Sequence, residues 1–175
     1  MIVTRRRVLG LAGGVAGGLL LGGRAGRAGE THRILMRGNA DESRVGFDPV
    51  GIRVRPGATL VWANTDPGNA HTSTAYAPPD RPRRIPAAAA AWSSDFLLPD
   101  ESFSVTLIAE GIYDYYCLPH EHAGMVGRIV VGDPDADGWP QDPGAAGDLP
   151  EAALAAFPAV EAILAAGLVR NAAFA

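Results

Sequence analysis

Three potential metal ligands with soft or intermediate donor atoms lie close together in the middle of the chain. Cys117 is the only cysteine among the 175 residues, and His120 and Met125 follow it. A thiolate, an imidazole and a thioether form a mixed donor set that favours copper over magnesium, calcium or manganese. Zinc fits this set poorly, because it contains a methionine and only one thiolate. The segment therefore predicts a copper site.

A fourth ligand must come from another part of the chain, and His71 is the best candidate. It follows an expected strand that ends at Asn64 and a turn-rich segment, Thr65-Asp66-Pro67-Gly68-Asn69. Such a turn would return the chain to the end of the fold where Cys117 lies. Two histidines and a thiolate, with a weak axial methionine, form the blue-copper electron-transfer arrangement.

These ligands need a rigid scaffold, and residues 31 to about 132 have the pattern of a β-sandwich. Short runs with β character alternate with Gly, Pro and Asx clusters, and residues 102–108 alternate cleanly between apolar and polar. Several short strands in about 100 residues predict an all-β, antiparallel sandwich. The expected strands are 32–37, 50–55, 59–64, 102–108, 111–116 and 126–131.

The segment Tyr116-Cys117-Leu118-Pro119-His120, followed by Ala123-Gly124-Met125-Val126-Gly127, resembles the ligand loop of the cupredoxins. Its Cys-x2-His-x4-Met spacing is similar to the plastocyanin, pseudoazurin and halocyanin type, whereas the amicyanin loop is shorter and the azurin loop is arranged differently. The similarity extends over about residues 34–132. The resemblance implies a Greek-key sandwich with one type 1 copper ion, and the ligands it implies are His71, Cys117, His120 and Met125.

Two positions depart from the cupredoxin pattern. The residue after the first ligand histidine is often asparagine in that family, whereas here it is Thr72. We therefore expect the side-chain link between the two ligand segments to be weaker or differently made. The additional His122 is expected to face solvent rather than bind the metal. Backbone N–H groups of Thr72 and of residues near Met125 are the candidates to point at the Cys117 sulfur, and the sequence does not distinguish between them.

The N-terminus resembles a twin-arginine export signal. Thr4-Arg5-Arg6-Arg7-Val8-Leu9 precedes a Gly-rich apolar run, and a cleavage point is expected near Ala28. This run of about 16 residues is shorter than the roughly 20 needed to span a bilayer. We therefore predict a signal over residues 1–28, a mature protein that is periplasmic or extracellular, and no stable membrane span after processing.

Charge limits the choice of partners. All fifteen basic residues are arginine, and removal of the five in residues 1–28 would change the net charge from −4 to −9. An acidic exported protein is a poor candidate for nucleic-acid binding. A monomer that meets redox protein partners, such as a cytochrome, an oxidase or a reductase, fits better.

The rest of the chain divides around a copper-binding domain at residues 30–132. Residues 69–94 are expected to form a surface crossover with a short helical piece at 87–91. Its basic cluster, Arg81-Pro82-Arg83-Arg84, is expected to be a solvated face, and docking of an acidic partner is the alternative. Residues 133–148 are rich in Asp, Pro and Gly and predict a linker. Residues 149–175 predict a helical tail of two short helices, the second starting at Pro158. The tail is expected to fold back on the sandwich in preference to binding a partner.

The predicted function is single-electron transfer, not enzymatic catalysis. Nitrite reductases and multicopper oxidases need additional copper centres, and four histidines with one cysteine cannot supply them. The binuclear purple copper site is also excluded, since it needs two cysteines. The alternative is a copper-binding or delivery protein that undergoes no redox turnover.

Overall fold

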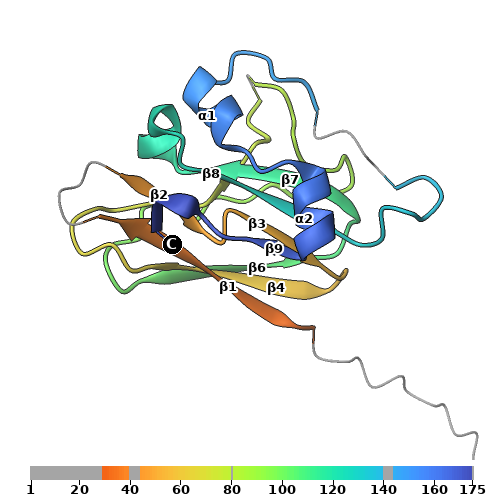
Figure 1. The fold of residues 1–175 in the computed structure, drawn as a ribbon, viewed down its shortest axis with the longest axis horizontal. Coiled ribbons are helices and arrows are strands. Elements are labelled where there is room, and N and C mark those ends of the chain that lie inside the picture. The colour runs from red at the N-terminus through yellow and green to blue at the C-terminus, as the bar shows by residue number, and fades with distance from the viewer. Residues whose placement is uncertain (1–28, 40–43, 80, 140–143, 175) are drawn as a thin grey trace, which may run out of the picture.

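The chain forms two β-sheets packed face to face, with two short helices on the outside of one sheet (Figure 1). This computed structural model describes residues 29–39, 44–79, 81–139 and 144–174. The predicted export signal at residues 1–28 lies outside the described residues. The sandwich predicted from the strand pattern is confirmed.

The strands of the two sheets are interleaved along the sequence. The four-stranded sheet has the order β2-β1-β4-β6, and its strands are β1 (Thr31–Gly38), β2 (Val45–Asp48), β4 (Ala58–Asn64) and β6 (Ser102–Leu107). The five-stranded sheet has the order β5-β7-β8-β3-β9, and its strands are β3 (Gly51–Val54), β5 (Thr74–Ala75), β7 (Gly111–Tyr116), β8 (Val126–Val131) and β9 (Leu168–Val169). The remaining elements are the 3-10 helices η1 (Leu118–Ala123) and η2 (Ala172–Phe174) and the helices α1 (Glu151–Ala156) and α2 (Val160–Ala166).

The sandwich is mixed rather than purely antiparallel, which refines the prediction. β1 pairs with β4 in parallel, and β3 pairs with β8 in parallel. The cause is the order of the crossings: the chain leaves the first sheet after β2, forms β3 in the second sheet, and then returns to place β4 beside β1. Tight hairpins give antiparallel neighbours, whereas crossovers of this kind permit parallel ones.

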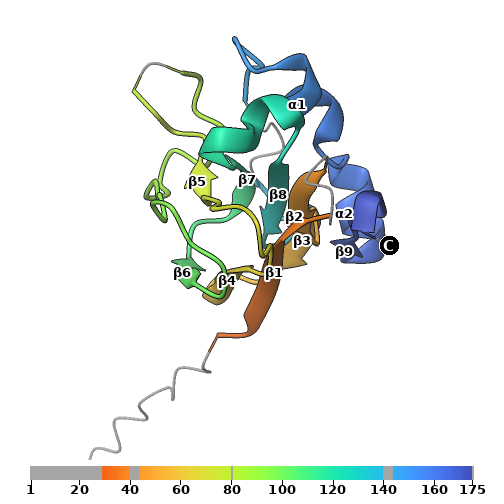
Figure 2. The ribbon, with the colours of Figure 1, turned by 90° about the vertical axis from the view of Figure 1, so that its left-hand side faces the viewer.

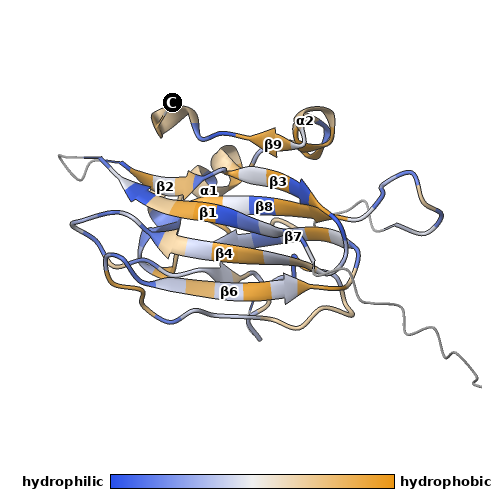
Figure 3. Cartoon of the chain, turned by 90° about the horizontal axis from the view of Figure 1, so that it is seen from below, coloured by the Kyte–Doolittle hydropathy of each residue, from blue (hydrophilic) through white to orange (hydrophobic). Residues whose placement is uncertain are grey.

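The core between the sheets is built from inward-facing residues at every second position. Ile34 and Met36 of β1 and Leu60 and Trp62 of β4 are fully buried. Trp62 packs edge-on against Tyr115 of the other sheet, with ring centroids 5.3 Å apart. β6 lies at the edge of its sheet and keeps the apolar and polar alternation seen in Figure 3. Alternation with a period of two therefore places one set of side chains in the core and the other set toward solvent, as expected for strands with one face in solvent.

The outer face of the five-stranded sheet is covered by the C-terminal tail. All residues of β7 and β8 are buried, because the other sheet lies on one side and the tail on the other (Figure 2). Ile163 of α2 is fully buried in a cluster with Ile112 and Val130, and β9 pairs with β3. The two short helices are as predicted, although the second begins at Val160, two residues later than expected.

Of two expectations for the crossover at residues 69–94, one is wrong and the other holds only in part. Residues 87–91 form a turn, closed by the bond from Ala89 N–H to Pro86 O, and no helix. Proline and a short alanine run are too little to nucleate an isolated helix. The basic cluster is solvated only in part: Arg83 is exposed, whereas the Arg84 side chain is only 5% exposed and is paired with Asp114.

Candidate metal centre

The ligand loop, residues 117–125, joins β7 to β8 at one end of the sandwich. It folds into η1, with Pro119 in its first turn and Gly124 in the left-handed conformation at its end (φ 78°). Backbone N–H groups of Cys117 and Met125 donate to Met125 O (2.9 Å) and His120 O (3.1 Å), respectively. These bonds close the loop on itself, so that the three residues with ligand side chains are held together.

His71 is delivered to the same end by the turn that follows β4. The Asn64 side-chain amide donates to Asn69 O (2.8 Å) and Leu97 O (2.9 Å), which fixes both ends of the turn. His71 and Leu97 then exchange two backbone hydrogen bonds, of 3.1 and 2.8 Å. The sequence predicted that this turn returns the chain to the Cys117 end, and the structure places it there.

Three of the four predicted ligand side chains converge. His71 Nδ1, Cys117 Sγ and His120 Nδ1 are separated by 3.2 to 3.6 Å. Among the described residues they form the only group of His, Cys, Asp or Glu side chains close enough to hold a metal ion, with their ligand atoms within 4.8 Å of one another. Met125 is fully buried, and its backbone is hydrogen-bonded to Cys117 and His120, so the residue lies next to this group.

Thr72 ties the two ligand segments together. Its backbone N–H donates to Cys117 Sγ at 3.3 Å, which identifies Thr72 among the donors that the sequence offered. Its hydroxyl accepts a hydrogen bond from the Leu118 N–H at 2.8 Å. The side-chain link that asparagine often provides is therefore made differently here, by a threonine hydroxyl.

The second ring nitrogen of His71, Nε2, is hydrogen-bonded to the carboxylate of Asp66, a residue that was not predicted to belong to the site. His71 Nε2 lies 2.9 Å from Asp66 Oδ2, and both side chains are almost completely buried. The pKa of Asp66 is lowered from its ordinary value. Burial raises it, but the hydrogen bonds from the Gly68 N–H, His71 and Asn69 outweigh that effect. The signal in the sequence was only an aspartate five residues before a histidine, in a segment where Asp is expected for turn formation.

The electrostatics of the metal-free site suit a cation. Burial raises the pKa of the Cys117 thiol to about 11, although the Thr72 N–H acts in the opposite direction. Burial lowers the pKa of both His71 and His120. At neutral pH the group is therefore a thiol and two neutral imidazoles, whose donor atoms converge without any internal positive charge. A soft cation that replaces the thiol proton fits this donor set.

The site lies just below the surface on the side of His120. His71 and Cys117 are fully buried, while His120 is partly exposed. Leu118 is 56% exposed and, with Pro119 and Ala123, forms an apolar rim. His122 is exposed and lies outside the converging group.

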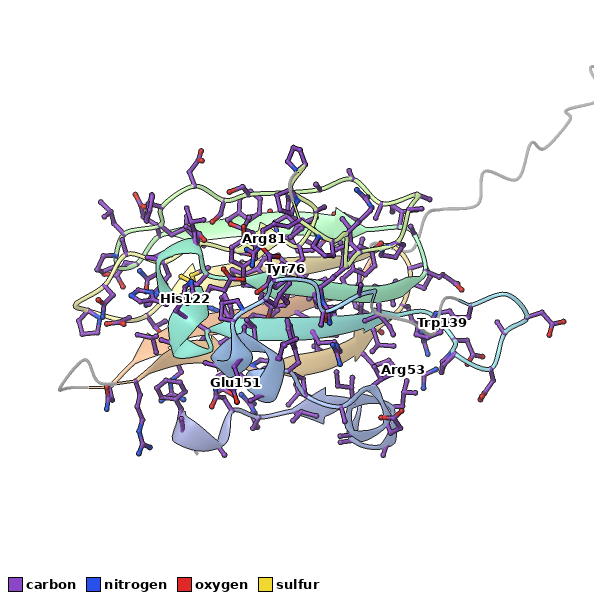
Figure 4. All side chains as sticks on the ribbon, turned by 90° about the horizontal axis from the view of Figure 1, so that it is seen from above. Arg53, Tyr76, Arg81, His122, Trp139 and Glu151 are labelled. Carbon is purple, nitrogen blue, oxygen red and sulfur yellow. The ribbon has the colours of Figure 1, made fainter. Side chains whose placement is uncertain are left out.

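A second unpredicted group holds the ligand loop from the side. Glu121 is buried and accepts hydrogen bonds from the Tyr76 hydroxyl at 2.7 Å and from both terminal nitrogens of Arg81, at 2.7 and 3.0 Å. Figure 4 shows Arg81 beside Tyr76, above the loop that carries His122. Arg81 thus pairs with the ligand loop, whereas the sequence analysis assigned it to a solvated face.

Comparisons with known proteins agree with this geometry. Residues 34–132 match the family described as copper binding proteins, plastocyanin/azurin family. The chloroplastic plastocyanin of Fritillaria agrestis is 37% identical over 99 residues, which cover 55% of this chain and 58% of that protein. The plastocyanin of Lactuca sativa is 33% identical over 99 residues, covering 55% of this chain and 97% of that protein.

A solved structure supports the fold over a longer stretch. The pseudoazurin from Sinorhizobium meliloti aligns with a TM-score of 0.55 and 28% sequence identity, covering 79% of this chain and 98% of that one.

Within the part of the chain that the structure describes, no helix is both long and apolar enough to cross a membrane.

Proposed function

The chain belongs to the plastocyanin/azurin family of copper-binding proteins, and from that premise we propose that it is an exported electron carrier with one type 1 copper ion held by His71, Cys117, His120 and Met125. The observation that carries the proposal is the convergence of one thiol and two imidazole nitrogens within 4.8 Å of one another. The nearby buried methionine completes the donor set of a blue-copper centre.

Each residue of the site has a distinct role in this proposal. When bound, copper supplies one-electron chemistry by alternating between Cu(I) and Cu(II). Cys117 provides the thiolate, and the Thr72 N–H stabilises the negative charge on its sulfur. His71 and His120 would provide neutral imidazoles, and Met125 would provide a weak thioether donor that tunes the reduction potential. Because backbone hydrogen bonds hold the ligand loop and His71 in place, we expect little rearrangement to accompany electron transfer.

The apolar rim around His120 supports a role in transient encounters. Exposed Leu118 and Ala123 can be desolvated at low cost by the surface of a redox partner, such as a cytochrome, an oxidase or a reductase. Small, weakly held contacts of this kind allow fast dissociation after electron transfer. The partly exposed His120 ring would then be the shortest route from the metal to the partner.

The test is a visible absorption and paramagnetic-resonance spectrum of the mature protein with Cu(II), recorded beside Cys117→Ser. The wild type is expected to show an intense thiolate-to-copper band and the narrow copper hyperfine splitting of a blue site, and to cycle reversibly between oxidation states. The serine variant should lose the band. A colourless wild type with an ordinary copper signal would overturn the proposal. Transfer of the copper to an acceptor without reversible cycling would favour a delivery protein.

Export is proposed from the twin-arginine pattern at Arg5, Arg6 and Arg7. The mature protein would be periplasmic or extracellular. Replacing all three arginines with lysine should leave the full-length precursor inside the cell, as seen by fractionation and immunoblotting. Unchanged export of the lysine variant would contradict the proposed route.

A further inference from the structure

We propose that Asp66 is a positioning residue of the metal centre, which orients the His71 imidazole and lowers the reduction potential of the bound copper. The inference rests on the proposed copper function. The Asp66 carboxylate lies behind the ligand, with Oδ2 2.9 Å from His71 Nε2. The two side chains are 2% and 0% exposed, so water cannot replace either partner.

The contact decides which nitrogen of His71 faces the metal site. A carboxylate accepts hydrogen bonds, so His71 Nε2 carries the hydrogen and donates it to Asp66. The lone pair is then left on Nδ1, which lies 3.6 Å from Cys117 Sγ and 3.2 Å from His120 Nδ1. The same carboxylate increases the basicity of the ring, as carboxylates behind histidine ligands do in other metal sites.

The carboxylate is itself held rigidly. The Gly68 N–H donates to Oδ1 at 2.9 Å, and the Asn69 side-chain amide donates to Oδ2 at 3.0 Å. The Asp66 N–H in turn donates to the Asn64 side chain at 2.9 Å. On the other side Oδ2 faces Gly38 of β1, where a Cβ atom would lie only 2.1 Å away. A side chain at position 38 would displace the carboxylate, which explains a glycine within this strand.

The charge of Asp66 acts on the metal through the imidazole. Among the described residues, His71 is the only basic side chain within ion-pair distance of Asp66. A buried negative charge without a guanidinium partner is poorly screened. It stabilises the oxidised metal more than the reduced metal, because the oxidised form carries one more positive charge. The expected consequence is a lower reduction potential than in a site with a neutral group behind His71.

The test compares Asp66→Asn with Asp133→Asn in the copper-loaded mature protein at one fixed pH. Asparagine removes the charge and keeps one oxygen that can accept the His71 hydrogen bond. Its amide nitrogen takes the place of Oδ1, which accepts from the Gly68 N–H in the wild type. Asp133 pairs with Arg53, at the end of the molecule opposite His122 in Figure 4, so its variant removes the same charge far from the site. Spectroelectrochemical titration should show at least a tenfold shift in the reduction equilibrium toward Cu(I) for Asp66→Asn, about 59 mV for a one-electron couple.

The control should shift the equilibrium much less. Equal shifts in the two variants, or none in Asp66→Asn, would overturn the role of Asp66 while leaving a blue wild-type protein intact. A wild type that forms no blue site would instead overturn the proposed function.

A second measurement needs no variant and covers the case in which Asp66→Asn does not fold. In the Cu(I) form of the wild type, nuclear magnetic resonance should detect a His71 Nε2 proton that exchanges slowly with water. A metal bound at Nε2, or a rapidly exchanging Nε2 proton, would contradict the hydrogen bond to Asp66.

Discussion

A buried thiol between two neutral imidazoles binds a metal only by losing its proton. Because burial raises the pKa of Cys117 to about 11, the thiol is protonated in the metal-free protein at pH 7. Burial lowers the pKa values of His71 and His120, so neither ring holds an extra proton there. The cost of ionising Cys117 is therefore met only when a cation is bound.

This leads to a prediction about proton release. Titrating the metal-free mature protein with Co(II) at pH 7, a metal that avoids oxidation of the thiol, should release about one proton per ion bound. Calorimetry in two buffers with different ionisation enthalpies measures that number. The Cys117→Ser variant is the control and should release none on binding. A wild type that releases no proton would mean that the thiol is not a ligand.

At the scale of elements, the ligand loop is fixed by three residues on two other segments. Thr72 reaches it from the turn before β5, and Tyr76 and Arg81 reach it from the crossover. Glu121 accepts the hydrogen bonds from Tyr76 and Arg81, and it follows His120 directly in the sequence. The position of the ligand His120 thus depends on an ion pair that is not part of the metal site.

We expect Glu121→Gln to lower the free energy of unfolding by about 2 kcal/mol. In the described part of the chain it leaves the largely buried Arg81 with one carboxylate within ion-pair distance, that of Asp148 at 3.7 Å. Copper should also dissociate faster, because the loop that holds His120 loses its lateral support. Urea unfolding and a chelator-competition assay measure the two effects.

The matched control is Tyr76→Phe, which removes one hydrogen bond to the same carboxylate and leaves the ion pair intact. It should cost about 1 kcal/mol. If Glu121→Gln were as mild as this control, the ion pair would not be what holds the loop.

The predictability of these elements differs for a physical reason. Cys117, His120 and Met125 are close in sequence, so their spacing alone indicated a shared site. The role of Glu121 in positioning the loop could not be predicted from the sequence, because its partners Tyr76 and Arg81 are 45 and 40 residues away. The hydrogen bond from the Leu118 N–H to the Thr72 hydroxyl was likewise not predicted, since it depends on a contact between two loops. Strands were predicted from alternation, whereas the two-residue β5 and β9 are too short to have a pattern of their own.

At the scale of the whole molecule, the apolar rim around His120 is the surface that would meet a redox partner. We expect Ala123→Glu to slow electron self-exchange between Cu(I) and Cu(II) copies by at least about tenfold at low ionic strength. Two such rims would then bring like charges together, and salt should partly restore the rate. Line broadening in nuclear magnetic resonance spectra of mixed samples measures this rate.

The visible spectrum of Ala123→Glu should stay blue, because Ala123 is exposed and is not a ligand. Ala123→Gln adds the same bulk without charge and should retain most of the rate. Self-exchange as fast in the glutamate variant as in the wild type would mean that copies meet on another surface.

The C-terminal tail makes the sandwich a three-layer molecule, and it reaches the metal site. The family model matches residues 34–132 and so does not include the tail, whereas the alignment with the pseudoazurin structure extends over 79% of the chain. α2 covers the five-stranded sheet, and α1 packs on the ligand loop, where a Cβ on Gly124 would lie 3.1 Å from the Ala152 carbonyl oxygen. The sequence predicted helices here but not their buried face: Leu154 is 39% exposed, whereas Ala153 and Ile163 are fully buried.

We therefore expect Ile163→Ala to destabilise the protein by about 2–5 kcal/mol, the usual cost of emptying a fully buried site. Ile163 packs against Gly51 of β3, where a Cβ would come within 2.7 Å of it, so the glycine leaves the room that the Ile163 side chain occupies. Leu154→Ala removes a similar number of carbons from an exposed position and should change stability by no more than about 0.5 kcal/mol. Urea unfolding of the metal-free protein compares the two. Equal and small losses of stability in the two variants would mean that the tail only rests on the sheet. A large loss of stability for Ile163→Ala alone, with the blue spectrum retained in the folded protein, identifies the tail as part of the core that supports the metal site.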